Sequence, residues 1–501
     1  MSDLHHLTAT EQRQLIARGE VSALELTEHY LDRIDRLNPQ LRAFITVTAD
    51  AARERAVALD TRRETGGLRH THLHDHPLWG LPFGDKDLID RAGVPTTYGS
   101  RAMAQNVPDA SNPLVTTMDA AGGVSLGKTN TPEFGFPSYT ENELFADDDS
   151  GASRVARNPW NTSLGPGGSS GGAAVAVAAR MLPFAPGSDG GGSVRIPAAA
   201  CGLVGLKPSR GRIPDGSGQD ALAGLVVAGP LARTVDDAAL LLDGMISRAR
   251  HPFALVAPGG QASYLDALQR PVRPLRIGYN TWSPWATHYR IEVEDEAMDA
   301  LNRTLKLAER LGHTIERATP KPFPEFFDAF RMVWQGGAAG VPLGDEALAQ
   351  VQPLTRWLIE TGRTRKAGEL AVALAALARF EQQIIADYAD YDIVLTPAMA
   401  MGPRPIGWYD AADGERNFEQ QCQYTPFTSY LNVAGLPAIS LPVHYNDAAA
   451  SAAVLDGGAA VAVPYGVQAI GRPGAELTLL QFGQQLEREL QWHQRVPAIA
   501  G

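Results

Sequence analysis

Apolar and polar positions recur with a helical period over several long stretches of the chain. Residues 8–36 place an apolar side chain about every three to four residues, with a break near Gly19 that predicts two consecutive amphipathic helices. Residues 291–312 form a further amphipathic run, and Gly312 marks its predicted end. Additional helices are predicted over residues 234–247, 323–334 and 476–490.

Short apolar runs bounded by proline and glycine lie between these helices and predict buried strands. The stretch "PLWGLPFGDKDLID" (residues 77–90) reads as a strand that enters a turn, and residues 124–127 form a second short strand. Two more strands are predicted within residues 391–400 and 435–443. Because strands alternate with helices, the chain is predicted to adopt an α/β layered fold with a mixed or parallel sheet.

Composition narrows the classes of partner. The 501 residues carry a formal net charge of -12, and no segment combines clustered Lys and Arg with aromatic residues, so a nucleic-acid groove is not expected. An anionic membrane surface would also repel such a chain. The two cysteines lie far apart, which excludes a disulfide framework or a thiolate zinc site. No secretory signal or long apolar span is visible, so a soluble cytoplasmic protein is expected.

The glycine-serine stretch "GPGGSSGGAAVAVAAR" (residues 165–180) allows three chemistries. A phosphate loop requires a Lys and a Ser or Thr after its last glycine, and alanines stand there instead. The pattern G-x-S-x-G around Ser169 matches a nucleophile elbow, but no apolar strand precedes it. The third possibility is a serine activated by a buried, neutral lysine. Lys86 and Ser193 supply the lysine and a second hydroxyl, whereas each glycine-serine block alone would be a structural turn.

A set of ordered motifs carries a family resemblance. The motifs are "PFGDKDLID", "LGKTNTPEF", "RNPW", "GPGGSSGGAAVAVAA", "GSDGGGSVRIPAAACGLVGLKPSRGRI" and "PYGVQAIG". They follow one another in order, within a match that runs from about residue 8 to 490. The chain resembles the amidase signature family. This resemblance implies that Lys86 is a catalytic base, that Ser169 is a bridging serine and that Ser193 is the nucleophile. It also implies a cis peptide bond between Gly168 and Ser169.

The resemblance further implies a single α/β/α domain over residues 1–501, with a large twisted mixed sheet flanked by helices. Its core motifs occupy residues 77–235 and 390–490, and a variable, helical, substrate-shaping region covers about residues 250–390. Backbone N–H groups free of side chains suit an oxyanion hole, and the glycines before Ser193 are expected to provide it. The remaining site residues are expected to be Gly190, Gly191 and Gly192 for the oxyanion, Phe134, Gly135 and Phe136 for the pocket, and Ser170, Asp189 and Arg195 for loop support.

Some features depart from the family pattern or invite other interpretations. Asp85 precedes Lys86, and its carboxylate would raise the pKa of Lys86 if the two side chains lay close together. Neighbouring side chains on a strand point apart, so Asp85 is expected to face away from Lys86. Residues 146–156 form an acidic insertion of unassigned role, and the His-rich residues 70–76 are expected to form a solvated loop. The aromatic run from Phe323 to Trp334 is expected to belong to the core more than to the pocket, and Cys201 to be a small buried residue.

The resulting hypothesis is an amidase that cleaves the C–N bond of a small-molecule amide through an acyl-enzyme, without metal or cofactor, and that resembles aryl acylamidases or oligoamide hydrolases. The same attack can extend to esters and carbamates. One alternative is the glutaminase (A) subunit of a tRNA-dependent amidotransferase, although Ile196 stands where that subunit usually has glutamine. The other is a non-catalytic binding protein, which the retention of Lys86, Ser169 and Ser193 disfavours. The sequence leaves open the physiological substrate and whether the chain forms a homodimer.

Overall fold

The protein contains a small sheet and a large sheet, and the candidate site residues are distributed between them. The computed structural model describes residues 3–67, 75–142, 155–213, 222–246, 263–446 and 462–501. The small sheet has the order β1-β3-β2, and the large sheet has the order β4-β6-β5-β10-β11-β9-β7-β8. The strands are β1 (Phe44–Val47), β2 (Pro82–Lys86), β3 (Val124–Thr129), β4 (Phe184–Asp189), β5 (Val204–Lys207), β6 (Val227–Ala232), β7 (Arg276–Tyr279), β8 (Thr314–Arg317), β9 (Ile393–Pro397), β10 (Ala438–Tyr445) and β11 (Pro464–Gly471).

The large sheet is mixed, as expected. Strands β7, β8 and β9 pair in parallel, whereas β4, β6, β5, β10 and β11 pair with antiparallel neighbours. In the small sheet β2 runs parallel to β3 and β1 runs antiparallel to it. The sequence did not reveal that the strand ending at Lys86 would belong to a separate sheet.

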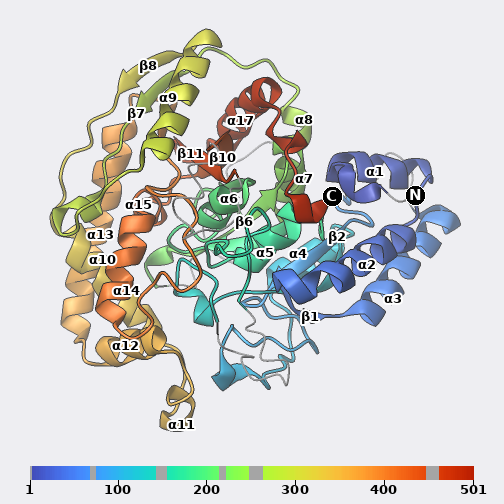
Figure 1. Ribbon diagram of the computed structural model, residues 1–501, viewed down its shortest axis with the longest axis horizontal. Coiled ribbons are helices and arrows are strands. Elements are labelled where there is room, and N and C mark those ends of the chain that lie inside the picture. Colours follow the sequence, from blue (N-terminus) through green and yellow to red (C-terminus); the bar gives the residue numbers. More distant parts are fainter. Residues whose placement is uncertain (1–2, 68–74, 143–154, 214–221, 247–262, 447–461) are drawn as a thin grey trace.

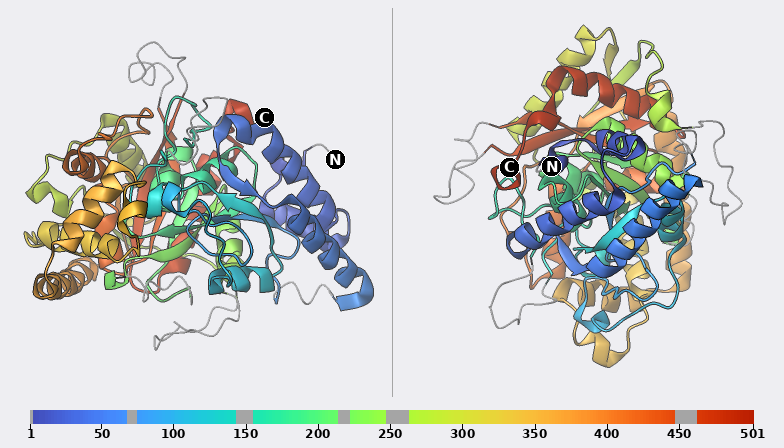
Figure 2. Two further views of the ribbon diagram at one scale, coloured as in Figure 1. Left: turned by 90° about the horizontal axis from the view of Figure 1, so that it is seen from below. Right: turned by 90° about the vertical axis from the view of Figure 1, so that its right-hand side faces the viewer.

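Helices cover both sides of the sheets. They are α1 (Ala9–Arg18), α2 (Ala23–Leu41), α3 (Ala49–Arg62), α4 (Pro113–Ala120), α5 (Gly171–Ala178), α6 (Arg195–Cys201), α7 (Val235–Ile246), α8 (Tyr264–Ala267), α9 (Asp295–Arg310), α10 (Phe326–Ala339), α11 (Asp345–Leu348), α12 (Pro353–Arg363), α13 (Ala367–Tyr388), α14 (Gly414–Tyr424), α15 (Ser429–Val433) and α17 (Glu476–Leu490). The amino-terminal helices α1–α3 lie at one end of the molecule, and α10, α12 and α13 lie at the other (Figures 1 and 2).

Local sequence explains where several of these helices begin and end. The break predicted near Gly19 separates α1 from α2, and the side chains of Thr8 and Ser22 accept N–H bonds at the two helix N-termini. The Ala/Val run after the glycine-serine loop forms α5, whose residues are all buried. A helix that is apolar on every face belongs in the interior of a layered protein, where each face contacts other apolar side chains. Helix α5 therefore anchors the loop that precedes it.

In the part of the chain that the structure describes, no helix combines the length and apolar character that a membrane span needs. The acidic insertion at residues 146–156 and the His-rich residues 70–76 lie mostly outside the described residues. The described end of the His-rich segment, His76, forms a hydrogen bond with the Ala120 carbonyl at 2.8 Å.

Candidate active site

Lys86 is the last residue of β2, and its side chain reaches Ser169 in the glycine-serine loop and Ser188 on β4 of the large sheet. Its Nζ donates to Ser169 Oγ at 2.8 Å, to Ser188 Oγ at 3.0 Å and to the Ser188 carbonyl at 3.3 Å. Only 1% of the residue is exposed. Burial lowers the pKa of Lys86 from 10.5 to about 7, and the nearby Asp189 carboxylate opposes this change. The lysine is therefore able to lose and regain a proton near neutral pH.

Asp85, the other charge on this strand, points away from Lys86 as predicted. Its carboxylate accepts hydrogen bonds from Arg91 Nε at 2.7 Å and from Ser125 Oγ at 2.8 Å. Only Asp189, among carboxylates of the described part of the chain, acts on the pKa of Lys86. The departure from the family pattern at Asp85 is thus accommodated by a separate ion pair.

Ser169 lies in the glycine-serine loop that leads into α5. The peptide bond between Gly168 and Ser169 is cis, as the resemblance implies. A side chain at Gly168 would place its Cβ 2.7 Å from the backbone of Tyr139, so only glycine fits this approach. The next residue, Ser170, joins this loop to the second glycine-serine block, because its N–H donates to the Ser193 carbonyl at 3.2 Å and its Oγ donates to the Ser188 carbonyl at 3.2 Å.

Ser193 lies between β4 and α6 in a turn that is organised by an ion pair. Arg195 donates to Asp189 through Nε at 3.0 Å and through a terminal nitrogen at 2.8 Å. The Asp189 carboxylate also accepts the N–H groups of Gly192 at 2.8 Å and Val194 at 3.1 Å. Burial alone would raise the pKa of this carboxyl, but the charge and hydrogen bonds of Arg195 outweigh burial and lower it. Asp189 and Arg195 therefore join the two ends of this turn through hydrogen bonds.

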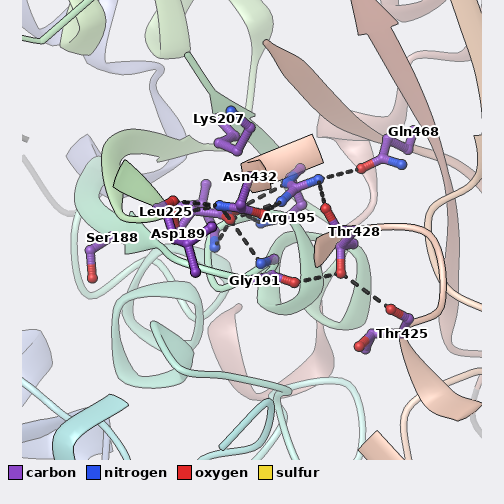
Figure 3. Close-up of polar contacts among 12 residues, drawn as sticks. Ser188, Asp189, Gly191, Arg195, Lys207, Leu225, Thr425, Thr428, Asn432 and Gln468 are labelled. Carbon is purple, nitrogen blue, oxygen red and sulfur yellow. Dashed lines mark hydrogen bonds and ion pairs between the residues drawn. The ribbon is translucent and has the colours of Figure 1, made fainter. Parts of the chain in front are cut away.

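Residues from the carboxy-terminal part of the chain complete the support of this turn, and no sequence pattern indicated them. Arg195 also donates to the Thr428 carbonyl at 3.0 Å and to Gln468 Oε1 at 2.7 Å (Figure 3). Asn432 Nδ2 donates to the Asp189 carbonyl at 2.8 Å, and Thr428 Oγ1 donates to the Gly191 carbonyl at 2.6 Å. Each contact crosses more than two hundred residues of sequence, which local patterns do not encode.

The expected oxyanion donors need one correction. The Gly192 N–H is engaged by the Asp189 carboxylate, so it is not free to bind an oxyanion. Among the described residues, the N–H groups of Gly190, Gly191 and Ser193 have no hydrogen-bond acceptor. Gly192 is needed for its shape, because its φ is +133° and a Cβ there would approach Thr428 Oγ1 to 2.5 Å.

Two cavities meet at Ser193. The first, called the large chamber, has a volume of about 1040 Å³, and its walls include Ser169, Ser193 and Gly190. The second, called the small chamber, has a volume of about 60 Å³, and its walls include Ser193 and Gly191. The described walls of both chambers contain no Asp, Glu, Lys, Arg or His side chain.

The predicted pocket residues Phe134, Gly135 and Phe136 all line the large chamber. Residues that the sequence did not single out line it as well, and they come from the loop after β2, the segment before β6, helix α10 and the start of α13: Leu88, Tyr98, Leu222, Ala223, Val226, Gly336, Gly337 and Leu370. The aromatic run of residues 323–334 divides as expected. Its phenylalanines are buried in a hydrophobic cluster, and Phe330 among them also lines the small chamber, whereas Trp334 lines both chambers. Cys201 is buried in the core, as predicted.

Comparison with known proteins agrees with this geometry. A family model described as Amidase matches residues 25–480. The Mycobacterium tuberculosis protein named "Putative amidase AmiB2" is 35% identical over 507 aligned residues, which cover 100% of this chain and 99% of that protein. The glutamyl-tRNA(Gln) amidotransferase of Roseiflexus sp. (strain RS-1) contributes a second relative. Its A component is 32% identical and is covered to 99%, with 100% of this chain aligned.

The fold is also similar to that of a solved hydrolase. The structure of 6-aminohexanoate cyclic dimer hydrolase complexed with substrate superposes with a TM-score of 0.84 at 29% identity, covering 99% of this chain and 100% of that chain. The family match spans most of the sequence, and the relatives align over their whole lengths. The chain therefore belongs to the amidase signature family and is an amide-hydrolysing enzyme.

Proposed function

We propose that the protein is a serine amidohydrolase in which Lys86, Ser169 and Ser193 act as base, proton bridge and nucleophile. The observation that carries this proposal is the 2.8 Å contact between Lys86 Nζ and Ser169 Oγ, made by a buried lysine whose pKa is lowered to about 7. A lysine with an ordinary pKa would be protonated at neutral pH and could not accept a proton. Burial therefore prepares this group for general-base catalysis.

The proposed reaction begins when neutral Lys86 takes the Ser169 proton while Ser169 takes the proton of Ser193. The Ser193 oxygen then forms a bond to the amide carbonyl carbon, and the carbonyl electron pair moves to the oxygen. The N–H groups of Gly190, Gly191 and Ser193 are proposed to bind this oxyanion, a contribution of about a hundredfold or more in rate for each donor. The C–N bond breaks as the leaving nitrogen receives the proton through Ser169.

The second half of the proposed reaction returns the enzyme to its starting state. Water replaces the amine, loses its proton through Ser169 to Lys86 and adds to the acyl-enzyme carbonyl carbon. The ester bond to Ser193 then breaks, the serine oxygen regains a proton and the carboxylic acid leaves. Asp189, Arg195 and Ser170 are proposed to hold the two loops in place and to take no part in proton transfer.

The chamber walls support a neutral amide as substrate. Free glutamine carries an ammonium and a carboxylate next to each other, and buried charges of this kind require charged or strongly hydrogen-bonding partners. The described walls of the chambers lack charged side chains. An uncharged wall supports a stand-alone amidase for apolar amides over the glutaminase component of an amidotransferase, even though such a component is about one third identical to this chain.

Hydrolysis assays on the purified chain test this proposal. At least one of acetanilide and benzamide is expected to be hydrolysed, whereas glutamine is expected to release no ammonia above background. A fluorophosphonate probe is expected to label the wild-type protein and to leave Ser193→Ala unlabelled. Glutamine hydrolysis without amide hydrolysis would favour the glutaminase alternative. An unlabelled wild type without any hydrolysis would favour a non-catalytic binding protein.

A further inference from the structure

Three residues are common to the walls of the two chambers. They are Ser193, Phe136 and Trp334. A group bonded to Ser193 Oγ thus faces a chamber of about 1040 Å³ on one side and one of about 60 Å³ on the other. The rings of Phe136 and Trp334 stand between the chambers, with their centroids 6.2 Å apart and their planes at 72°.

The rings of Phe136 and Trp334 form the partition between the chambers, and each of them is supported by another ring. Trp334 stacks on Phe330 at 5.6 Å between centroids, and Phe136 packs against Phe134 at 6.1 Å. Phe330 is buried, so moving Trp334 toward it would compress the aromatic cluster that contains α10. The neighbouring rings therefore hold both rings of the partition in place.

The small chamber is enclosed by the same cluster. Trp285 lines it, is only 2% exposed and donates its indole N–H to Ser429 Oγ at 3.0 Å. The Trp285 ring also meets Phe330 and Phe418 edge-on, at 5.2 and 5.8 Å. Enlarging the chamber would disturb these contacts, and forcing extra atoms into a packed region costs about 1–3 kcal/mol.

The two groups on an amide carbonyl carbon extend in different directions, so one is directed to each chamber when the carbon lies at Ser193. A volume of about 60 Å³ admits only a small group of a few non-hydrogen atoms. The large chamber is of the size that encloses a drug-sized molecule, and its walls are mainly apolar. The chambers thus differ in capacity by more than tenfold.

We propose that the enzyme selects amides with one bulky, uncharged substituent and one small substituent on the two sides of the C–N bond, and that Phe136 and Trp334 set this selection. The inference rests on the proposed function, since it places the scissile carbonyl at Ser193. Its substrates are primary amides of bulky acids, which release ammonia, or short-chain acyl derivatives of bulky amines. Amides that are bulky on both sides are excluded.

Three neutral substrates of graded shape test the selection. Benzamide is bulky on the acyl side, acetanilide is bulky on the amine side, and benzanilide is bulky on both. For the wild type, kcat/KM for at least one of the first two is expected to exceed that for benzanilide by about a hundredfold, since a hydrophobic pocket discriminates by tenfold or more for each group that does not fit. Whichever single-sided amide is preferred identifies the group that enters the large chamber.

Trp334→Ala removes half of the partition and joins the chambers, so the kcat/KM for benzanilide relative to the preferred single-sided amide is expected to rise at least about tenfold. Trp282→Ala is the matched control, because Trp282 is a half-buried indole in the same aromatic cluster that lines neither chamber. Its ratio is expected to stay at the wild-type value. Phe136→Leu is the milder second variant, and its ratio is expected to rise in the same direction.

Two results would overturn the selection. One is wild-type hydrolysis of benzanilide as efficient as that of both single-sided amides, and the other is an unchanged ratio in folded Trp334→Ala and Phe136→Leu. A wild type whose Ser193 reacts with fluorophosphonate but that hydrolyses none of the three amides also contradicts it. Failure of the proposed function gives a different result, because Ser193 would then be unlabelled and its replacement would leave any hydrolysis intact.

Discussion

The protonation of Lys86 makes a quantitative prediction about pH. The Lys86 pKa is lowered from 10.5 to about 7 because the side chain is fully buried. At about 1.36 kcal/mol for each factor of ten, this corresponds to a preference of about 5 kcal/mol for the neutral form relative to water. Below pH 7 the lysine binds a proton and ceases to be a base. We therefore expect kcat/KM to rise about tenfold per pH unit up to pH 7 and to level above it.

Stability is expected to follow the same group. Between pH 7 and 10.5 the unfolded chain binds a proton at Lys86 that the native state lacks, so this group raises the free energy of unfolding by about 1.4 kcal/mol per pH unit as pH increases. Lys86→Met removes this dependence. The variant is therefore expected to be more stable than the wild type by the largest margin at or below pH 7, and the margin is expected to shrink toward pH 10. Urea unfolding of both proteins at pH 7, 8 and 9 measures it.

Lys207 is a matched control within the same chain. It is fully buried, its pKa is also lowered to about 7, and its Nζ donates to the Pro208 carbonyl at 2.9 Å, away from the serines. Lys207→Met is expected to retain the acid limb of the pH profile. A flat wild-type profile from pH 5.5 to 8, or loss of the limb in Lys207→Met, would refute the assignment of this limb to Lys86.

Three further substitutions test the surroundings. Asp189→Asn leaves Arg195 buried without its anionic partner, so we expect the free energy of unfolding, measured by denaturant melts, to fall by about 3–5 kcal/mol. Because Asp189 raises the pKa of Lys86, the acid limb of the pH profile is expected to move to lower pH in the same variant. Gly337→Leu adds a side chain to the large chamber at a site with no atom within 4 Å of its Cβ, so kcat/KM for bulky amides is expected to fall about tenfold, whereas Gly368→Leu, equally open but outside the chamber, is expected to leave it unchanged. Asp85→Asn is expected to lower the free energy of unfolding by about 1–3 kcal/mol and to leave the acid limb in place; a shifted limb would contradict the separation of Asp85 from Lys86.

Local patterns predicted the elements that carry the site residues. The strand before Lys86, the loop around Ser169 and the apolar helix α5 each follow from short runs of sequence. Adjacency of Lys86 and Ser169 followed from the family resemblance, and the structure brings them to 2.8 Å. The division into two sheets was not predictable, because strand pairing depends on contacts between distant segments and β2 alone has no pattern that distinguishes its partner.

The free N–H groups near Ser193 illustrate a second limit of prediction from the sequence. Glycine in a sequence indicates that a side chain is absent, but it does not indicate where the N–H points. The Asp189 carboxylate accepts the Gly192 N–H and leaves the Ser193 N–H free. This difference depends on the folded geometry of the whole turn. For the same reason the sequence did not reveal that Gly337 lines the large chamber.

Arg195 bears on when the enzyme becomes active during its synthesis. The Thr428 carbonyl and the Gln468 side chain that it binds follow it in the chain by 233 and 273 residues. At about 5–20 residues per second, the ribosome needs roughly 15 to 55 seconds to supply the later of them. Until Gln468 has been added, a nascent chain that already holds Lys86, Ser169 and Ser193 lacks part of the support of the Ser193 turn. The turn around Ser193 therefore gains its full support only when the segment that carries Thr428 and Gln468 has joined the fold.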